Sequence, residues 1–180
     1  MREQLGDQLQ VNWRYFPLEQ VNSAEGPEWK LWEQPDSHRS RGRVAFQAAI
    51  AARNQGDEAF ERFHWGLLKA KHEDGQDHGK ASTLRAVAEE AGLDLEQFEQ
   101  DRTDRSMLSK IGEDYAEGHD RLGAFGTPTF IFTNEAAVYL KLTPKSPLSD
   151  PMSFFEDFIR IGRDRTDVLE IKRPKRPSTG

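Results

Sequence analysis

Apolar and polar residues follow two spacings along the chain, one typical of strands and one typical of helices. The segment LQVNWRYFPL, residues 9–18, alternates apolar with polar positions and is rich in aromatic residues, which predicts a strand. Pro17 marks its end, because proline cannot donate a hydrogen bond to a sheet. Residues 19–41 contain glycine and proline and are predicted to form a long irregular connection.

Helical spacing dominates residues 42–122. Apolar residues recur there every three or four positions, which predicts about five short helices packed as a subdomain. Gly56 and Gly92 are predicted to end helices, because glycine adopts the backbone conformation that closes them. Asp57 and Asp94 are predicted to cap the helices that follow.

Strand spacing returns after the helical block. The segments TFIF, residues 129–132, and AVYLKL, residues 137–142, flank a short connection and predict a β-hairpin. Asp150 as a cap and Pro151 as the first helical residue then predict a final helix. The buried face of that helix is predicted to carry Phe154, Phe155, Phe158 and Ile159. The order strand, helical block, hairpin and helix predicts an α/β fold.

Composition narrows the classes of partner and the expected location. Lys and Arg number 25 and Asp and Glu number 31, giving a net charge of −6. This balance argues against a nucleic-acid or anionic-membrane binder, because both need a basic surface. No apolar run approaches the roughly 20 residues of a membrane helix. The first ten residues, MREQLGDQLQ, lack the apolar segment of a signal peptide, so we expect a cytoplasmic protein.

The sequence contains no clear motif for binding a metal ion or a nucleotide. The acidic and histidine-containing segment from His64 to His78 lacks the helical zinc spacing and the regular acid spacing of a calcium loop. It is predicted to be a solvated polar turn, and His64 a hydrogen-bonded core histidine. No glycine-rich phosphate loop and no Gly-X-Ser-X-Gly segment occur. We therefore expect no metal site.

The segment FGTPTF, residues 125–130, places a proline at the entrance of the first hairpin strand. Proline avoids such positions unless a tight turn or an exposed backbone is needed. An X-Pro bond reaches the cis form far more cheaply than other peptide bonds. Local chemistry leaves two interpretations of Thr127-Pro128: a trans proline at a strand entrance, or a cis bond that exposes the Thr127 backbone to a partner.

The whole pattern resembles the DsbA family of the thioredoxin-like superfamily, in particular its FrnE-type and 2-hydroxychromene-2-carboxylate isomerase-like branch. The segments that carry the resemblance are VNWRYFPLEQVN, FHWGLLKAKHEDGQD, AEEAGLDLEQF and, above all, GAFGTPTFIF. The resemblance implies an α/β thioredoxin-like part in residues 1–41 and 123–165. Residues 42–122 would be an inserted helical subdomain, and residues 166–180 a mobile tail.

The resemblance also implies a binding site around the proline. Pro128 would be the family's cis proline, and the backbone of Thr127 would pair in β fashion with a bound peptide, protein thiol or glutathione-like substrate. Phe125 and Gly126 would shape the approach. No resident cofactor is expected, and glutathione is the one small ligand that the resemblance suggests.

Two departures from the family pattern bear on function. The chain has no cysteine, so its own side chains cannot carry out dithiol exchange and supply no catalytic residue. The family's first strand and Cys-X-X-Cys helix are also expected to be missing, since VNWRYF begins near the start of the chain. Three explanations stay open: a start inside a longer gene product, a redox-inactive partner-binding form, or another residue replacing the first cysteine.

The functional hypothesis is therefore a DsbA-like thiol–disulfide oxidoreductase by lineage that is redox-inactive in this chain. One alternative is a glutathione-assisted isomerase or transferase of the same superfamily. The other is a non-catalytic module that forms a homodimer or binds a partner protein.

Overall fold

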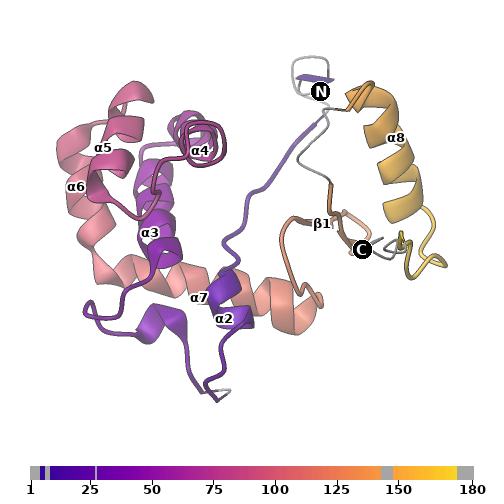
Figure 1. The fold of residues 1–180 in the computed structure, drawn as a ribbon, viewed down its shortest axis with the longest axis horizontal. Coiled ribbons are helices and arrows are strands. Elements are labelled where there is room, and N and C mark those ends of the chain that lie inside the picture. The colour runs from indigo at the N-terminus through magenta and orange to yellow at the C-terminus, as the bar shows by residue number, and fades with distance from the viewer. Residues whose placement is uncertain (1–4, 7–8, 27, 143–147, 174–180) are drawn as a thin grey trace, which may run out of the picture. The chain divides into compact units, whose positions relative to one another are not determined.

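The computed structural model describes residues 5–6, 9–26, 28–142 and 148–173 (Figure 1). The chain forms two compact units, which are described separately. The helical unit is Trp13–Arg121, and the hairpin unit combines Met1–Asn12 with Leu122–Gly180.

The helical unit contains four long helices and several short helical turns. Its helices are α2 (Leu18–Val21), α3 (Arg41–Asn54), α4 (Asp57–His72), α5 (Ala81–Glu90), α6 (Leu95–Thr103) and α7 (Ser109–Tyr115). Its 3₁₀ and π segments are η2 (Leu31–Glu33), η3 (Arg105–Leu108) and η4 (Ala116–Arg121). The core lies between α3, α4, α5 and α6, where the largest fully buried side chains include Phe63, Leu84, Phe98 and Ile111.

The predicted helix ends are confirmed, except that the cap of α4 lies one residue earlier than predicted. Asp94 caps α6 by accepting hydrogen bonds from the backbone amides of Glu96 and Gln97 at 2.9 and 3.1 Å. Gly92, with φ of 70°, follows the end of α5 as predicted. The cap of α4 is Gly56 rather than Asp57, which is the first residue of that helix. Gly56 has φ of 112°, a conformation that favours glycine.

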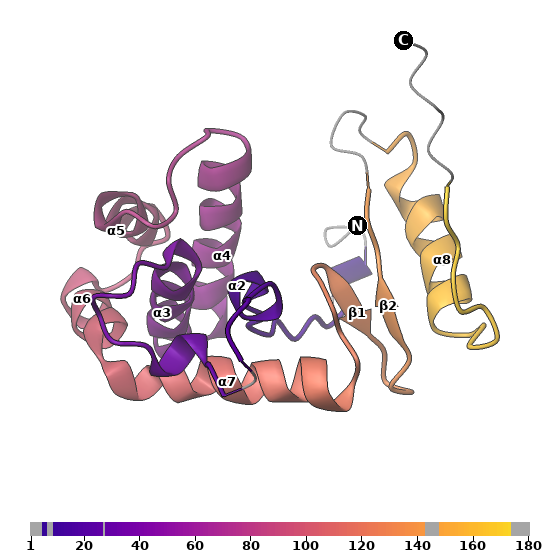
Figure 2. The same ribbon diagram turned by 60° about the horizontal axis from the view of Figure 1, so that its bottom comes forward.

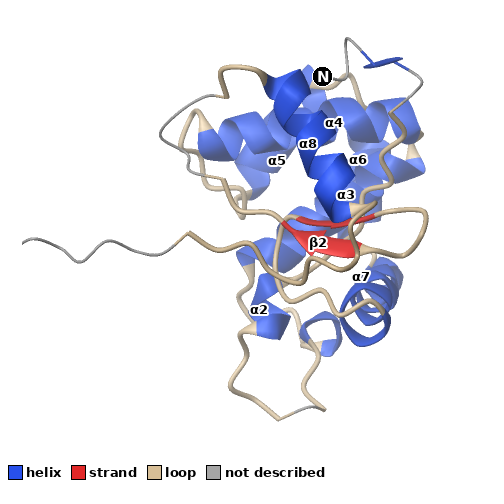
Figure 3. Cartoon of the chain, turned by 90° about the vertical axis from the view of Figure 1, so that its right-hand side faces the viewer, coloured by secondary structure: helices blue, strands red, loops and turns tan. Residues whose placement is uncertain are grey.

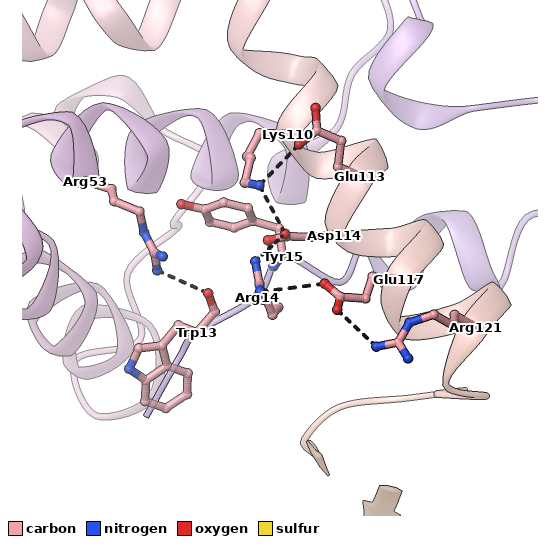
Figure 4. A network of polar contacts seen from close by, with 9 residues as sticks. All are labelled: Trp13, Arg14, Tyr15, Arg53, Lys110, Glu113, Asp114, Glu117 and Arg121. Atoms are coloured by element: carbon pink, nitrogen blue, oxygen red, sulfur yellow. Dashed lines mark hydrogen bonds and ion pairs between the residues drawn. The ribbon is translucent and has the colours of Figure 1, made fainter. Parts of the chain in front are cut away.

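The predicted strand over residues 9–18 is wrong. Residues 9–17 form no strand, and α2 begins at Leu18. The backbone groups there pair with helix side chains instead of with a neighbouring strand (Figure 4). The Tyr15 amide donates to a carboxylate oxygen of Asp114 at 3.0 Å, and Arg53 donates to the carbonyl of Trp13 at 3.2 Å.

Asp114 is the centre of the polar network that joins residues 13–15 to α7 (Figure 4). Its side chain is 3% exposed and accepts from Arg14 at 3.1 Å, in addition to the Tyr15 amide. The ammonium group of Lys110 lies 3.6 Å away. A buried carboxylate is stable only when charged and hydrogen-bonding partners compensate its lost hydration, and these three groups provide them.

The hairpin unit contains the antiparallel strands β1 and β2 and the helix α8 (Figure 3). Strand β1 (Thr129–Ile131) pairs with β2 (Ala137–Tyr139), with Phe130 opposite Val138. Helix α8 (Pro151–Gly162) begins with the predicted cap, since Asp150 accepts from the amide of Ser153 at 3.0 Å. The predicted hairpin and final helix are therefore confirmed.

Helix α8 covers one face of the hairpin. The ring of Phe158 lies 4.9 Å from that of Phe130 and 5.9 Å from that of Phe132. Gly162 allows close approach, because a side chain there would lie 3.1 Å from Val138 and 3.2 Å from Phe132. Of the predicted buried face, Phe158 is buried, and Phe154, Phe155 and Ile159 are half-buried. The other face of the hairpin carries Ile131 and Tyr139, which alternate with the covered residues.

The described residues form a mixed α/β structure that is mostly helical with a two-stranded sheet, so the predicted fold class is confirmed. The domain boundaries predicted at residues 42 and 122 stay a prediction. Residues 13–41 pack with the helices of the helical unit. Among the residues with described positions, no helix has the length and apolar character needed to span a bilayer.

Candidate functional site

The four predicted site residues lie together immediately before β1, in the hairpin unit. Phe125 is 65% exposed, and its ring lies 5.1 Å from that of Tyr139 on β2. Gly126 is buried beneath the same tyrosine, where an added side chain would lie 3.2 Å from the ring. Glycine therefore suits this position because the backbone passes close to an aromatic side chain.

Thr127 and Pro128 follow as exposed residues, and the peptide bond between them is cis. The turn is held against β2 by the carbonyl of Pro128, which accepts from the amide of Leu140 at 3.2 Å. The hydroxyl of Thr129 donates to the carbonyl of Gly126 at 2.7 Å. These two hydrogen bonds fix the backbone of the turn on both sides of the proline.

The outer edge of β1 presents backbone groups without a strand partner. The carbonyl of Pro128 accepts from the amide of Leu140, and the amide of Phe132 donates to the carbonyl of Ala136. Both partners flank β2, so the even-numbered residues of this segment direct their backbone groups toward β2. Because these directions alternate in an antiparallel pair, those of Thr129 and Ile131 point to the other edge. No strand of the described chain pairs with that edge. Thr127 lies just outside β1, before the cis bond, and its amide and carbonyl have no hydrogen-bond partner among the described residues.

The proline does not interrupt this edge. Pro128 lacks an amide hydrogen, but its position in the alternation directs its backbone toward β2. Thr129 and Ile131, which face outward, both keep their donors, and so does Thr127 before the proline.

An apolar surface lies beside the edge. Phe125, Ile131 and Tyr139 are 65, 42 and 36% exposed. Ile131 and Tyr139 project from the hairpin face that α8 does not cover, and Phe125 packs against Tyr139. We name the unpaired backbone groups of Thr127, Thr129 and Ile131 together with these three side chains the open edge. Its chemistry suits an extended peptide, because backbone groups supply hydrogen bonds and apolar side chains supply contact area.

Tyr139 was not among the predicted site residues. Its position opposite Thr129 follows from the hairpin register, which could have been obtained from the alternation of TFIF and AVYLKL. The contact with Phe125 depends on the turn before β1 and has no local sequence signal.

The remaining candidate groups lie in the helical unit and serve its core. His64 packs 4.3 Å from Trp13 between ring centroids, and burial together with the nearby Arg53 cation lowers the pKa of His64. Burial raises the pKa of Tyr15 to about 12, although Arg53 opposes this shift. Both side chains are therefore neutral near pH 7. His64 makes no side-chain hydrogen bond through Nε2, contrary to the predicted hydrogen-bonded histidine.

Among the residues with described positions, no group of three or more histidine or acidic side chains is arranged to hold a metal ion. In the segment from His64 to His78, the residues up to His72 belong to α4. The polar loop predicted from HEDGQDHGK, residues 72–80, connects α4 to α5.

A helical block followed by a Thr-Pro turn, a hairpin and a covering helix is consistent with a thioredoxin-like domain. The family model of the DSBA-like thioredoxin domain matches residues 2–160. The chain therefore belongs to this family, which is of the thiol–disulfide oxidoreductase type. The comparison with curated proteins gave no match.

Proposed function

We propose that this chain is a peptide-binding member of the DSBA-like family, in which the open edge accepts an extended segment of a partner protein as an added strand. The observation that carries the proposal is the set of backbone groups at Thr127, Thr129 and Ile131, which have no strand partner in the described chain. Strand addition to an exposed edge is a general mode of peptide recognition.

The proposed step is binding without thiol exchange by the chain's own residues. Exchange requires a thiolate, and the sequence contains no cysteine. Phe125, Gly126, Thr127 and Pro128 are proposed as substrate-binding residues, with no catalytic residue in the chain. A thiol on the bound peptide would remain unchanged by this chain alone.

Glutathione is a second ligand that the same edge supports, because it is itself a short peptide with backbone donors and acceptors. It would pair with Thr127 alone and contact less of the apolar surface than a longer peptide. Titration calorimetry with glutathione tests this alternative, and an octapeptide of alternating valine and serine serves as the competitor. A heat of glutathione binding that disappears in excess octapeptide would favour binding at the open edge, and the absence of any heat would contradict it.

Membership of the FrnE-type branch and the cytoplasmic location stay predictions. The segment GAFGTPTFIF supports the first, and the first ten residues support the second. A homodimer stays a prediction as well, and sedimentation tests it by the mass of the particle.

Replacing Phe125 by alanine is expected to weaken peptide binding about tenfold, which corresponds to about 1.4 kcal/mol. The ring is mostly exposed and supplies apolar area that a bound peptide would cover. The probe is a fluorescein-labelled octapeptide of alternating valine and serine, measured by fluorescence anisotropy with the full chain.

Two controls make this measurement specific. Leu148→Ala removes an apolar side chain that is 38% exposed and lies outside the open edge, and it should leave the affinity unchanged. An octapeptide methylated on alternate backbone nitrogens lacks the donors needed for strand addition and should bind poorly. Equal affinity of the methylated and unmethylated peptides would contradict the proposal.

A further inference from the structure

The segment that follows α8 leaves apolar side chains exposed. Leu169 is 95% exposed and Ile171 is 72% exposed, the highest values among the large apolar residues of the described chain. The stretch Asp-Val-Leu-Glu-Ile, residues 167–171, contains two β-branched residues and no glycine or proline, a composition that suits a strand. Two apolar side chains at alternate positions would fall on one face of that strand.

The segment starts close to the end of β1. The side-chain amide of Asn134, in the hairpin connection, donates to the carbonyl of Arg163 at 2.8 Å. This bond holds the end of α8 beside the connection between the strands. Beyond it the amide of Val168 donates to the carbonyl of Arg165 at 3.0 Å, which forms a turn. Figure 2 shows the chain reversing there and running back along α8.

This geometry allows the segment to reach the open edge. The five residues between Arg163 and Leu169 span up to about 17 Å when extended. Adjacent strands lie only about 5 Å apart. Because the chain has already reversed, the segment would run antiparallel to β1, which is the direction that a tight connection favours.

We propose that residues 167–173, named the tail strand, occupy the open edge as an added antiparallel strand and compete there with peptide partners. This inference rests on the peptide-binding edge proposed above and adds its regulation. Leu169 would lie opposite Ile131, and Ile171 opposite Thr129. Each such pair exchanges two backbone hydrogen bonds through the outward groups of β1.

The register follows from the side chains that need burial. Opposed residues of an antiparallel pair project from the same face of the sheet. With Leu169 opposite Ile131, both apolar residues of the tail strand join the hairpin face that carries Ile131 and Tyr139. A shift by one residue would place Glu170 on that face instead, which is unfavourable.

Cysteine pairs in the full chain test this register, because the natural sequence contains no competing thiol. In Thr129→Cys with Ile171→Cys, the opposed Cα atoms would lie about 5.5 Å apart, within the range of a disulfide. In Thr129→Cys with Glu170→Cys, the second side chain would point to the opposite face. Diamide oxidation followed by peptide mass mapping measures the yield of each disulfide.

A high yield for the 129/171 pair and a low yield for the 129/170 pair is the expected result. Equal yields would show unspecific collision and would overturn the inference, and so would the absence of both disulfides. Size-exclusion chromatography of the oxidised 129/171 product distinguishes two sources of the tail strand. A monomer shows that the chain pairs with its own tail, and a dimer shows exchange between two copies.

Competition with peptide separates this inference from the proposed function. Leu169→Asp should raise the affinity for the octapeptide about tenfold if the tail strand occupies the edge in nine of ten molecules. Glu170→Asp serves as the matched control and should change it little. If the octapeptide binds the parent chain and Leu169→Asp with equal affinity, tail competition is wrong while peptide binding stands. If no octapeptide binds Leu169→Asp, the proposed function is wrong.

Discussion

Replacing Asp114 by alanine is expected to lower the free energy of unfolding of the helical unit by about 3 kcal/mol. The side chain is 3% exposed and accepts from Arg14 and from the backbone amide of Tyr15. Alanine would leave that buried amide without a partner and would remove the counter-charge of Arg14 and Lys110. Because the segment containing Tyr15 has no strand neighbour, this network is its main polar attachment to α7.

Tryptophan fluorescence during urea unfolding is the measurement of choice. All four tryptophans, at positions 13, 29, 32 and 65, belong to the helical unit, so the signal reports its unfolding. Glu113→Ala is the matched control, because Glu113 neighbours Asp114 on α7 but its side chain is 63% exposed and pairs with Lys110 at the surface. Its loss should cost no more than about 0.5 kcal/mol. Equal effects of the two substitutions would contradict the assigned role of Asp114.

Replacing Phe158 by alanine is expected to destabilise the hairpin unit by about 3 kcal/mol. Phe158 is buried and packs against Phe130 on β1 and against Phe132 just beyond it, so it joins α8 to the hairpin. A two-stranded hairpin is only marginally stable without a packed face. Loss of this ring should therefore loosen the strand that presents the open edge.

Amide hydrogen exchange by NMR measures this effect in the unit that lacks tryptophan. The amide of Val138, which pairs with β1, should exchange faster in Phe158→Ala. Ile161→Ala is the control on the same helix, because Ile161 is 39% exposed and a surface substitution there should cost about 0.5 kcal/mol or less. Unchanged exchange at Val138 in Phe158→Ala would show that α8 does not hold the hairpin.

Local patterns predicted the elements whose signals are contained in a few neighbouring residues. Asp94 and Asp150 cap their helices through amides two or three positions ahead, so the sequence alone identified them. The hairpin was predictable because both of its strands are short, apolar and separated by a brief connection. The turn at Thr127-Pro128 stood out because proline is unusual at that place.

Distant partners explain what local patterns missed. The alternation of residues 9–18 indicated a strand, but a strand requires a neighbour to pair with. In the described structure Tyr15 pairs with Asp114, 99 positions away. Gln55 likewise exchanges two hydrogen bonds with the backbone of Asp94, 39 positions away, and neither contact has a signal in the local sequence. The packing of Phe125 on Tyr139 belongs to the same class.

Hydrogen exchange at β1 in the presence of the valine–serine octapeptide is the most direct test of strand addition at the open edge. The amides of Thr129 and Ile131 point outward, whereas the amide of Phe130 already pairs with β2. With the peptide at about 100 times its dissociation constant, exchange at Thr129 and Ile131 should slow by up to about 100-fold, with a much smaller change at Phe130. Protection that is equal at all three amides, or absent at Thr129 and Ile131 when the peptide is bound, would contradict the account.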